Sequence, residues 1–245
     1  MRARRRKDGG GRRFLLLLAG IVVLVVFVSG GLIAYNMLSG RCDLGVLEGF
    51  GGVRVYFDEQ SSLLPNLSLV AVGPERARYE VYVFYDLYCP FCAWEFYESL
   101  PILLGYSSSG KIKLYMVDTI LHREARESHG LLRSAVGSNG SYFKALYLAS
   151  CRLHVNGRVP DASYMRDVLG KLNVTVSDNV VRIEIAKAQQ VTEGALRLLA
   201  TLYGSPAYVG TPTIVVYDSE FREVRVFLPG RVEPERIDFA LRTLP

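Results

Sequence analysis

Hydrophobic positions along this chain follow two different periods, and each period predicts a kind of element. Short runs of β-branched and aromatic residues predict strands at 53–57, 67–72, 79–85, 111–117, 213–217 and 224–227. Apolar residues at helical spacing predict helices at 89–104, 123–136, 142–153, 162–172 and 180–203, and a last helix beginning at Pro234. The predicted order is therefore β-α-β, a helical insertion at about 122–203, and then β-β-α.

A separate apolar segment precedes these elements. Residues 14–40 contain no charged side chain. A membrane-spanning helix needs about 20 apolar residues, so 14–38 is long enough to span. The alternative is a cleaved signal peptide, whose apolar part is typically about 7–15 residues long and ends at a small-residue cleavage site. The segment is longer than that, so we predict one uncleaved transmembrane helix at 14–38.

Charge along the chain predicts how that helix is oriented. The 245 residues carry a net charge of +5, which would suit an acidic partner such as nucleic acid. However, residues 1–13 hold seven basic residues against one acidic residue, and residues 14–245 hold 22 against 23. Basic residues beside a first span stay on the cytoplasmic side. We therefore expect a cytoplasmic tail at 1–13, an extracytoplasmic domain, and no nucleic-acid partner.

Beyond the predicted helix, composition divides the chain once more. Residues 45–52 are rich in glycine, so 39–66 is expected to be a juxtamembrane linker with one short strand. Residues 67–245 then form the folded domain. Three N-x-[ST] triplets, at Asn66, Asn139 and Asn173, all follow the span, which agrees with an external domain and leaves glycosylation open.

The motif Cys89-Pro90-Phe91-Cys92 stands where a predicted buried strand gives way to a helix. The thiolate is the reactive form of cysteine, and a helix N-terminus stabilises it. Pro90 suits the first helical turn, where its missing N–H costs nothing. Cys89 is therefore the candidate nucleophile, and Cys92 is placed to close a disulfide with it or to resolve a mixed disulfide.

Half of a zinc site is the alternative interpretation of this motif, because C-x-x-C also binds metal. The other candidate ligands are Cys42, Cys151, His122, His129 and His154, and none of them forms a second ligand pair at zinc-binding spacing. His122 and His129, seven residues apart on one helical face, are better interpreted as surface or packing residues. We therefore expect no metal and no other cofactor.

A second motif, Gly210-Thr211-Pro212-Thr213, comes directly before the strand predicted at 213–217. Together with 83–92, it resembles the DsbA-like branch of the thioredoxin superfamily, over roughly 67–244. The resemblance implies a thioredoxin fold with an inserted helical domain, a cis Pro212 beside the cysteine pair, and a Thr211 whose backbone receives an extended substrate segment.

The resemblance also concerns acidic residues near the motif. Asp86 matches the family's pattern three residues before the first cysteine. Asp86 has two alternative roles: an ordinary turn residue, or a proton acceptor for Cys92. The family often places a buried acid six residues before the first cysteine, to relay the proton of the resolving thiol. This chain has Val83 there, which leaves the proton of Cys92 without its usual acceptor.

Two cysteines remain, Cys42 and Cys151. Outside the cytoplasm thiols tend to oxidise, so a structural disulfide between them is one possibility. Free buried thiols, or a link from Cys42 to another chain, are the others.

The sequence thus predicts an α/β protein with a thioredoxin fold, anchored in the cell membrane. We expect a thiol-disulfide oxidoreductase that introduces disulfides into exported, cysteine-containing polypeptides. Such an enzyme needs a membrane redox partner, which is either a quinone-linked oxidase or an electron-donating reductase. Two alternatives stay open: the same fold working as a disulfide reductase or isomerase, and a non-catalytic metal-binding or chaperone module.

Overall fold

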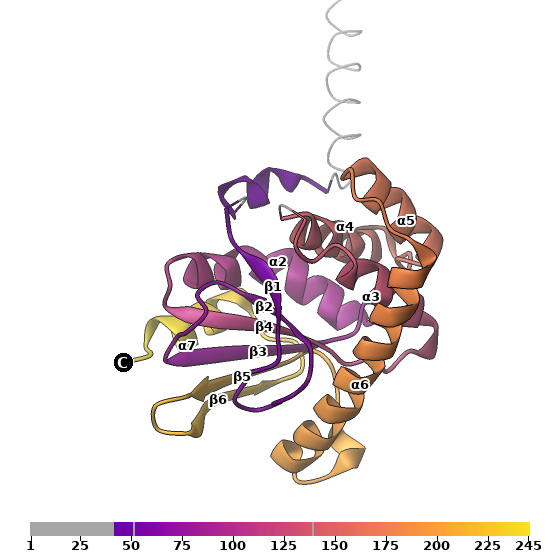
Figure 1. Ribbon diagram of the computed structural model, residues 1–245. Coiled ribbons are helices and arrows are strands. Elements are labelled where there is room, and N and C mark those ends of the chain that lie inside the picture. The colour runs from indigo at the N-terminus through magenta and orange to yellow at the C-terminus, as the bar shows by residue number, and fades with distance from the viewer. Residues whose placement is uncertain (1–41, 51, 139) are drawn as a thin grey trace, which may run out of the picture. The chain divides into compact units, whose positions relative to one another are not determined.

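The computed structural model describes residues 42–50, 52–138 and 140–245, and Figure 1 shows the arrangement of their helices and strands. The tail predicted at 1–13 and the transmembrane helix predicted at 14–38 lie outside the described residues. Among the helices that are described, none combines the length and the apolar character needed to cross a bilayer.

A six-stranded mixed sheet forms the centre of the domain (Figure 1). Its strands are β1 (Val55–Asp58), β2 (Leu69–Val72), β3 (Tyr79–Tyr85), β4 (Ile112–Asp118), β5 (Thr213–Asp218) and β6 (Glu223–Pro229), in the order β1-β2-β4-β3-β5-β6. The pair β3 and β4 is parallel and the other pairs are antiparallel. Every residue of β3 is buried, as expected for a central strand covered on both faces.

Helices cover both faces of this sheet. They are α2 (Pro90–Ser108), α3 (Arg126–Arg133), α4 (Ser141–Asn156), α5 (Ala162–Lys171), α6 (Asp178–Tyr203) and α7 (Pro234–Arg242). Short 3-10 helices occur at η1 (Leu44–Phe50), η2 (Arg123–Ala125) and η3 (Pro206–Tyr208). The parallel pair β3 and β4 is joined through α2, and α3 to α6 are inserted between β4 and β5, as the sequence predicts.

Alternation along β3 separates two apolar clusters. Val81, Val83 and Tyr85 point toward α2, α4 and α7, in the larger cluster. Tyr82 and Phe84 point to the other face, where the C-terminal half of α6 covers the sheet. Figure 1 shows α6 running from the helical insertion past the sheet. Because β3 is packed on both faces, its C-terminal end is held firmly in the domain. The start of α2, which follows that end, is held with it.

The segment predicted at 39–66 as a linker with one short strand contains that strand, as β1, but it also contains a packed helix. Residues 44–50 form η1, and Leu47 is only 3% exposed. Apolar Leu44, Leu47 and Phe50 recur every three residues, which places them on one side of a 3-10 helix, and they pack into the larger cluster. The glycines between them suggested a linker, but this apolar spacing decides the structure.

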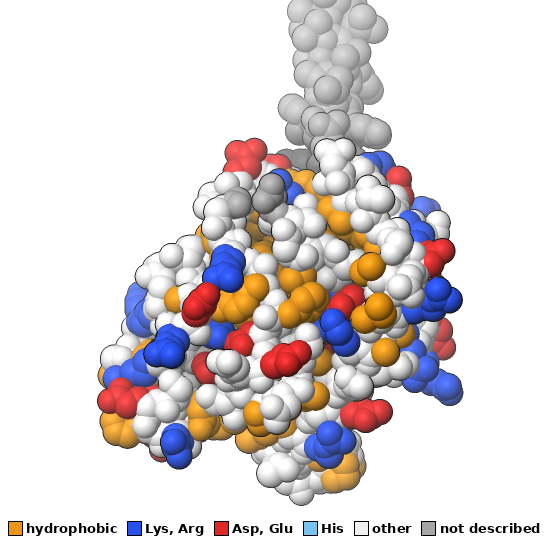
Figure 2. Space-filling view, viewed as in Figure 1, with side chains coloured by type: hydrophobic (Ala, Val, Ile, Leu, Met, Phe, Trp, Pro, Cys, Tyr) orange, Lys and Arg blue, Asp and Glu red, His pale blue; other side chains and the backbone are white. Residues whose placement is uncertain are grey.

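The disulfide considered between Cys42 and Cys151 is present, with the two Cα atoms 5.8 Å apart. It joins the first described residue to the middle of α4. The folded domain therefore includes the chain from Cys42 onward, and not only the part from residue 67. Over the face seen in Figure 2, basic and acidic side chains are interspersed, in keeping with the near-zero net charge of residues 14–245.

Candidate active site around Cys89 and Cys92

Cys89 and Cys92 lie at the N-terminus of α2, where the sequence predicts them. Cys89 is the N-cap residue, with an extended backbone, and Pro90 occupies the first helical position. The Cys89 N–H donates to the carbonyl of Asp86 at 3.1 Å, and the Cys89 carbonyl accepts the N–H of Ala93 at 3.0 Å. Both thiols are free, with Cys89 6% exposed and Cys92 1% exposed.

The two thiols differ in acidity. A hydrogen bond from the Cys92 thiol, helped by the backbone N–H groups of Cys92 and Phe91, lowers the pKa of Cys89 to about 6 although burial opposes this. Burial raises the pKa of Cys92 well above its usual range, and the neighbouring Cys89 thiolate raises it further. At neutral pH Cys89 is therefore a thiolate and Cys92 a thiol, which is the division that thiol-disulfide exchange requires.

The loop around Pro212 lies directly against Cys89. The Thr211-Pro212 peptide bond is cis, as the resemblance implies. The Cys89 Sγ donates to the Thr211 carbonyl oxygen at 3.2 Å, and the Pro212 carbonyl accepts the N–H of Gly230 at 2.8 Å. The chain on both sides of Pro212 is therefore held between Cys89 and the loop that follows β6.

Thr211 acts on Cys89 in two opposite ways. Its carbonyl oxygen accepts the Cys89 proton and so favours the thiol. Its buried hydroxyl is bound to no other described group, and as a donor directed at Cys89 it lowers the pKa of that thiol. Once Cys89 is ionised, it has no proton to donate to the carbonyl. The hydroxyl of Thr211 is then the group that stabilises the thiolate.

Thr211→Val is expected to raise the pKa of Cys89 from about 6 toward the ordinary cysteine value of about 8.5, because the donor is lost while shape is kept. The measurement is thiolate absorbance, together with the alkylation rate, as functions of pH. Thr201→Val, on the exposed side of α6, is the matched control. An unchanged titration midpoint in Thr211→Val contradicts the role of the hydroxyl.

The side chain of Asp86 joins the loop before Cys89 to the segment that follows β4 through hydrogen bonds. Its carboxylate is fully buried and accepts the N–H of Tyr88 at 2.8 Å, and the N–H groups of Leu121 and His122 at 2.7 Å each. His122 Nδ1 lies 2.9 Å from the same carboxylate. Burial raises the pKa of Asp86, but the contacts from His129 and these backbone donors outweigh it and hold the pKa well below its usual range.

The ionised state of Asp86 decides between its two interpretations. An acid whose pKa is held so low is a poor acceptor for a thiol proton near neutral pH. Asp86 is therefore a positioning residue for the loop that carries Cys89. It is a turn residue, but one whose contacts extend to a second segment of the chain.

Behind Asp86 lies a buried cluster of charged and polar side chains that sequence analysis missed. His129, interpreted as a surface or packing residue, is fully buried, with Nδ1 2.7 Å from Asp118 Oδ1. The N–H of Leu87 points at its Nε2, at 3.1 Å. Burial lowers the pKa of His129, but Asp118 and Asp86 outweigh it and raise the pKa to about 9.

Arg133 completes this cluster. Its guanidinium donates to Asp118 Oδ2 at 2.7 Å, to Glu184 Oε2 at 3.0 Å and to the Ser68 carbonyl at 2.8 Å. The only signal in the sequence was the spacing of His129 and Arg133, four residues apart in a predicted helix, which places both on one face. The pattern of apolar residues did not show that this face is turned toward the sheet.

Three segments that contact the site carry exposed apolar side chains. Phe91, within the motif, is 59% exposed, and Tyr208, three residues before Thr211, is 72% exposed. Leu121, whose N–H binds Asp86, is 42% exposed. Each belongs to a segment that contacts the site, so each is a candidate contact for an apolar substrate side chain.

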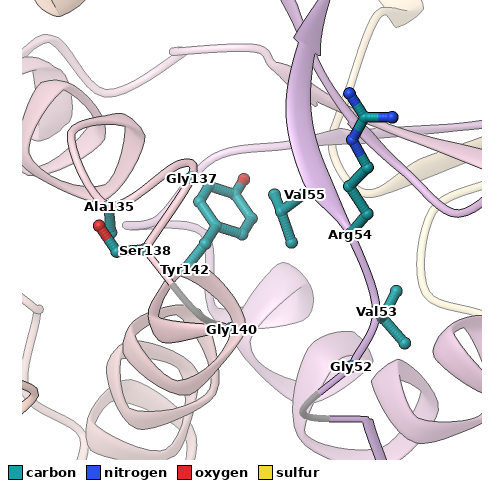
Figure 3. Close-up of a pocket in the computed structure, with 9 residues that line it drawn as sticks. All are labelled: Gly52, Val53, Arg54, Val55, Ala135, Gly137, Ser138, Gly140 and Tyr142. Carbon is teal, nitrogen blue, oxygen red and sulfur yellow. The ribbon is translucent and has the colours of Figure 1, made fainter.

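A pocket occurs between the start of β1 and the turn before α4 (Figure 3). No cysteine lines it, so it is not the redox site. Figure 3 shows the Tyr142 ring directed into it and the guanidinium of Arg54 directed away. The Tyr142 hydroxyl lies 3.1 Å from that of Tyr85, which in turn donates to Asp118. The pocket therefore borders the buried cluster.

The zinc interpretation would need more ligands than the described residues bring together. Within 42–50, 52–138 and 140–245, no group of three or more His, Cys, Asp or Glu side chains has an arrangement able to hold a metal ion. Cys42 and Cys151, two of the candidate ligands, are joined to each other.

Comparison with known proteins gives the same fold. The family model described as Thioredoxin matches residues 66–154. No curated protein matches this chain in sequence. Among solved structures, a variant of alpha-DsbA1 from Wolbachia pipientis is similar, with a TM-score of 0.59 and 14% identity over 75% of this chain and 94% of that chain.

Two further structures are similar over comparable lengths. A thioredoxin-like oxidoreductase from Silicibacter pomeroyi has a TM-score of 0.53 and 18% identity, over 76% of this chain and 96% of that chain. The thiol-disulfide exchange protein alpha-DsbA2 from Wolbachia pipientis has a TM-score of 0.51 and 16% identity, over 71% and 86%. The predicted thioredoxin-like α/β fold with extra helices is therefore confirmed.

Proposed function

We propose that this protein is a thiol-disulfide oxidoreductase that works through Cys89 and Cys92. The observation that carries the proposal is the contrast between the two thiols: an acidic Cys89 at the N-terminus of α2, and a buried Cys92 whose proton is held tightly. The cis Pro212 loop against Cys89 supports it, as does the similarity in fold to thiol-disulfide exchange proteins.

The exchange takes place in two steps. A substrate thiolate attacks Cys89 Sγ in the Cys89–Cys92 disulfide, the disulfide bond breaks, and Cys92 leaves with the electron pair and takes up a proton. A second substrate thiolate then attacks the substrate sulfur of the mixed disulfide and releases Cys89 as a thiolate. Because the Cys89 thiolate is stabilised, it is a good leaving group in this second step.

Oxidation of exported proteins is the direction we propose. The predicted tail at 1–13 and helix at 14–38 would anchor the chain in the cell membrane with its domain outside the cytoplasm. The Cys42–Cys151 disulfide supports an oxidising compartment. A quinone-linked membrane oxidase would then reoxidise Cys89 and Cys92, whereas an electron-donating membrane reductase would be the partner if the protein works as a reductase or isomerase.

The purified full-length protein is expected to speed disulfide formation in a reduced, unfolded protein when a disulfide oxidant regenerates the cysteine pair. The reduction potential then selects the direction. Because a lower thiol pKa stabilises the reduced form, we expect a potential above the value of about −270 mV found for thioredoxin and toward the about −120 mV of DsbA. A potential at or below that of thioredoxin favours a reductase, and stoichiometric zinc without exchange contradicts the enzyme assignment.

A further inference from the structure

Glu95 is a carboxyl group in the interior of α2, one helical turn after Cys92. Its side chain is fully buried, and Oε2 accepts the N–H of Val232 at 3.1 Å. Its other oxygen, Oε1, has no hydrogen-bond partner among the described residues, and neither has the buried hydroxyl of Ser99, one turn further along α2. Buried polar atoms are nearly always paired, so two unpaired ones on one helix face require an explanation.

Glu95 and Cys92 share the buried face of α2. Positions three apart on a helix are neighbours, with Cβ atoms about 5–6 Å apart, so these two buried side chains extend from adjacent points of that face. The hydrogen-bond donor of Glu95 gives a second link to the site. Val232 follows Gly230, whose N–H donates to the Pro212 carbonyl at 2.8 Å. Glu95 therefore contacts the same loop that supports the cis proline beside Cys89.

The groups around Glu95 leave it able to gain or lose a proton near neutral pH. Burial raises the pKa of Glu95 to about 7, although the Val232 N–H and the nearby Ser99 hydroxyl favour the carboxylate. The two charged groups of the adjoining loop oppose each other, since Glu233 raises this pKa and Arg231 lowers it. Arg231 is itself paired with Glu233, at 3.0 Å, and lies over the Trp94 ring.

We propose that Glu95 accepts and returns the proton of Cys92, in place of the strand acid that is absent at Val83. Its unpaired Oε1 receives the proton, directly or through one bridging water. Asp86 does not suit this role, because its carboxylate is already bound by several donors and stays ionised. The inference rests on the proposed function of Cys89 and Cys92.

The step balances in both directions. When Cys92 resolves a mixed disulfide, its thiol gives a proton to Glu95 and its sulfur attacks Cys89 Sγ. The Cys89–Cys92 bond forms, the bond from Cys89 to the substrate sulfur breaks, and the electron pair leaves with the substrate thiolate. In the reverse step a substrate thiolate attacks Cys89, and Cys92 leaves and takes the proton back from Glu95.

Glu95→Gln in the full chain tests this proposal, because glutamine still accepts the Val232 N–H but takes up no proton. Reduced protein is mixed with one equivalent of dithiobis(nitrobenzoate). The first nitrothiolate released reports the attack by Cys89, and the second reports resolution by Cys92. We expect an unchanged first phase, a second phase slowed at least about tenfold, and loss of the rise in its rate around pH 7.

Two further variants separate proton transfer from a structural role. Glu98→Gln removes a charge from the exposed side of the same helix and is expected to leave both phases unchanged. Glu95→Asp keeps a carboxyl group and is expected to restore part of the second phase and its pH dependence. A Glu95→Gln protein that resolves at the wild-type rate with the wild-type pH profile overturns the proposal. A wild-type protein that shows neither phase counts instead against the proposed function.

Discussion

Cys89→Ser is expected to reduce thiol-disulfide exchange to the uncatalysed rate, whereas Cys92→Ser is expected to stop the reaction at a mixed disulfide. The reason is the division of roles between an acidic thiol at the helix N-terminus and a buried one. The serine hydroxyl is not ionised at neutral pH and is too weak a nucleophile to attack a disulfide, so the first variant cannot form a bond with the substrate. The second forms that bond through Cys89 but has no thiol with which to resolve it.

Because Cys42 and Cys151 are joined, each of these variants holds a single free thiol. Non-reducing electrophoresis and mass spectrometry with a reduced, unfolded substrate then distinguish them. The covalent adduct is expected with Cys92→Ser and not with Cys89→Ser. Full exchange activity in Cys89→Ser would show that the motif is not the reactive centre. An adduct formed through Cys42 or Cys151 would assign the reaction to the other pair.

The redox motif could be predicted from the sequence because its features are local. A strand rich in aromatic and β-branched residues, the Cys89-Pro90-Phe91-Cys92 turn and the helical spacing after it all fall within a short stretch. The cis state of Pro212 came only from the resemblance, because about 5–6% of X-Pro bonds in folded proteins are cis. The pairing of Cys42 with Cys151 stayed open because they are 109 residues apart and spacing does not specify such a contact.

The charged residues inside the domain were missed for a different reason. His129, Arg133 and Glu95 are buried, and charged residues are ordinarily exposed, so local patterns assign them to the surface. Glu95 did carry one signal, since it lies beside Phe96 on the face of α2 that apolar spacing predicts to be buried. A single acid on such a face, in a chain that lacks the usual acid at Val83, could have indicated a role in the site.

Arg133→Met is expected to destabilise the folded domain by about 3–5 kcal/mol. Arg133 is fully buried between Asp118 and Glu184, at 2.7 and 3.0 Å, and it also binds the Ser68 carbonyl. Methionine fills similar volume but leaves Asp118 buried without its guanidinium partner, whereas Glu184 keeps Lys187 at 2.9 Å. Breaking a buried pair in this way costs far more than the pair itself contributes, because the remaining charge stays unsolvated.

Urea unfolding of Arg133→Met and of the wild type measures this cost, and Arg166→Met is the matched control. Arg166 also joins two carboxylates, those of Glu127 and Asp178, at 3.1 and 3.0 Å, but it lies at the surface. Exposed ion pairs contribute about 0–1 kcal/mol, so the control should unfold close to the wild type. An equal decrease in the free energy of unfolding in the two variants would mean that the burial of Arg133 does not affect stability.

The effect of Arg133→Met should shrink as the pH falls. In the wild type, burial raises the pKa of Asp118, but Arg133 and His129 outweigh it and hold the pKa below its usual value. Ionised Asp118 therefore stabilises the wild type above the unfolded pKa of about 3.9, and this contribution is lost as the pH falls through the lower folded value. Without Arg133 the pKa of the buried carboxyl is expected to rise above the unfolded value, so protonation relieves the variant at pH values above about 3.9, where the wild type still keeps its contribution. A difference in stability that stays constant down to pH 4 would contradict this account of the cluster, and would instead assign the loss to packing around the side chain of residue 133.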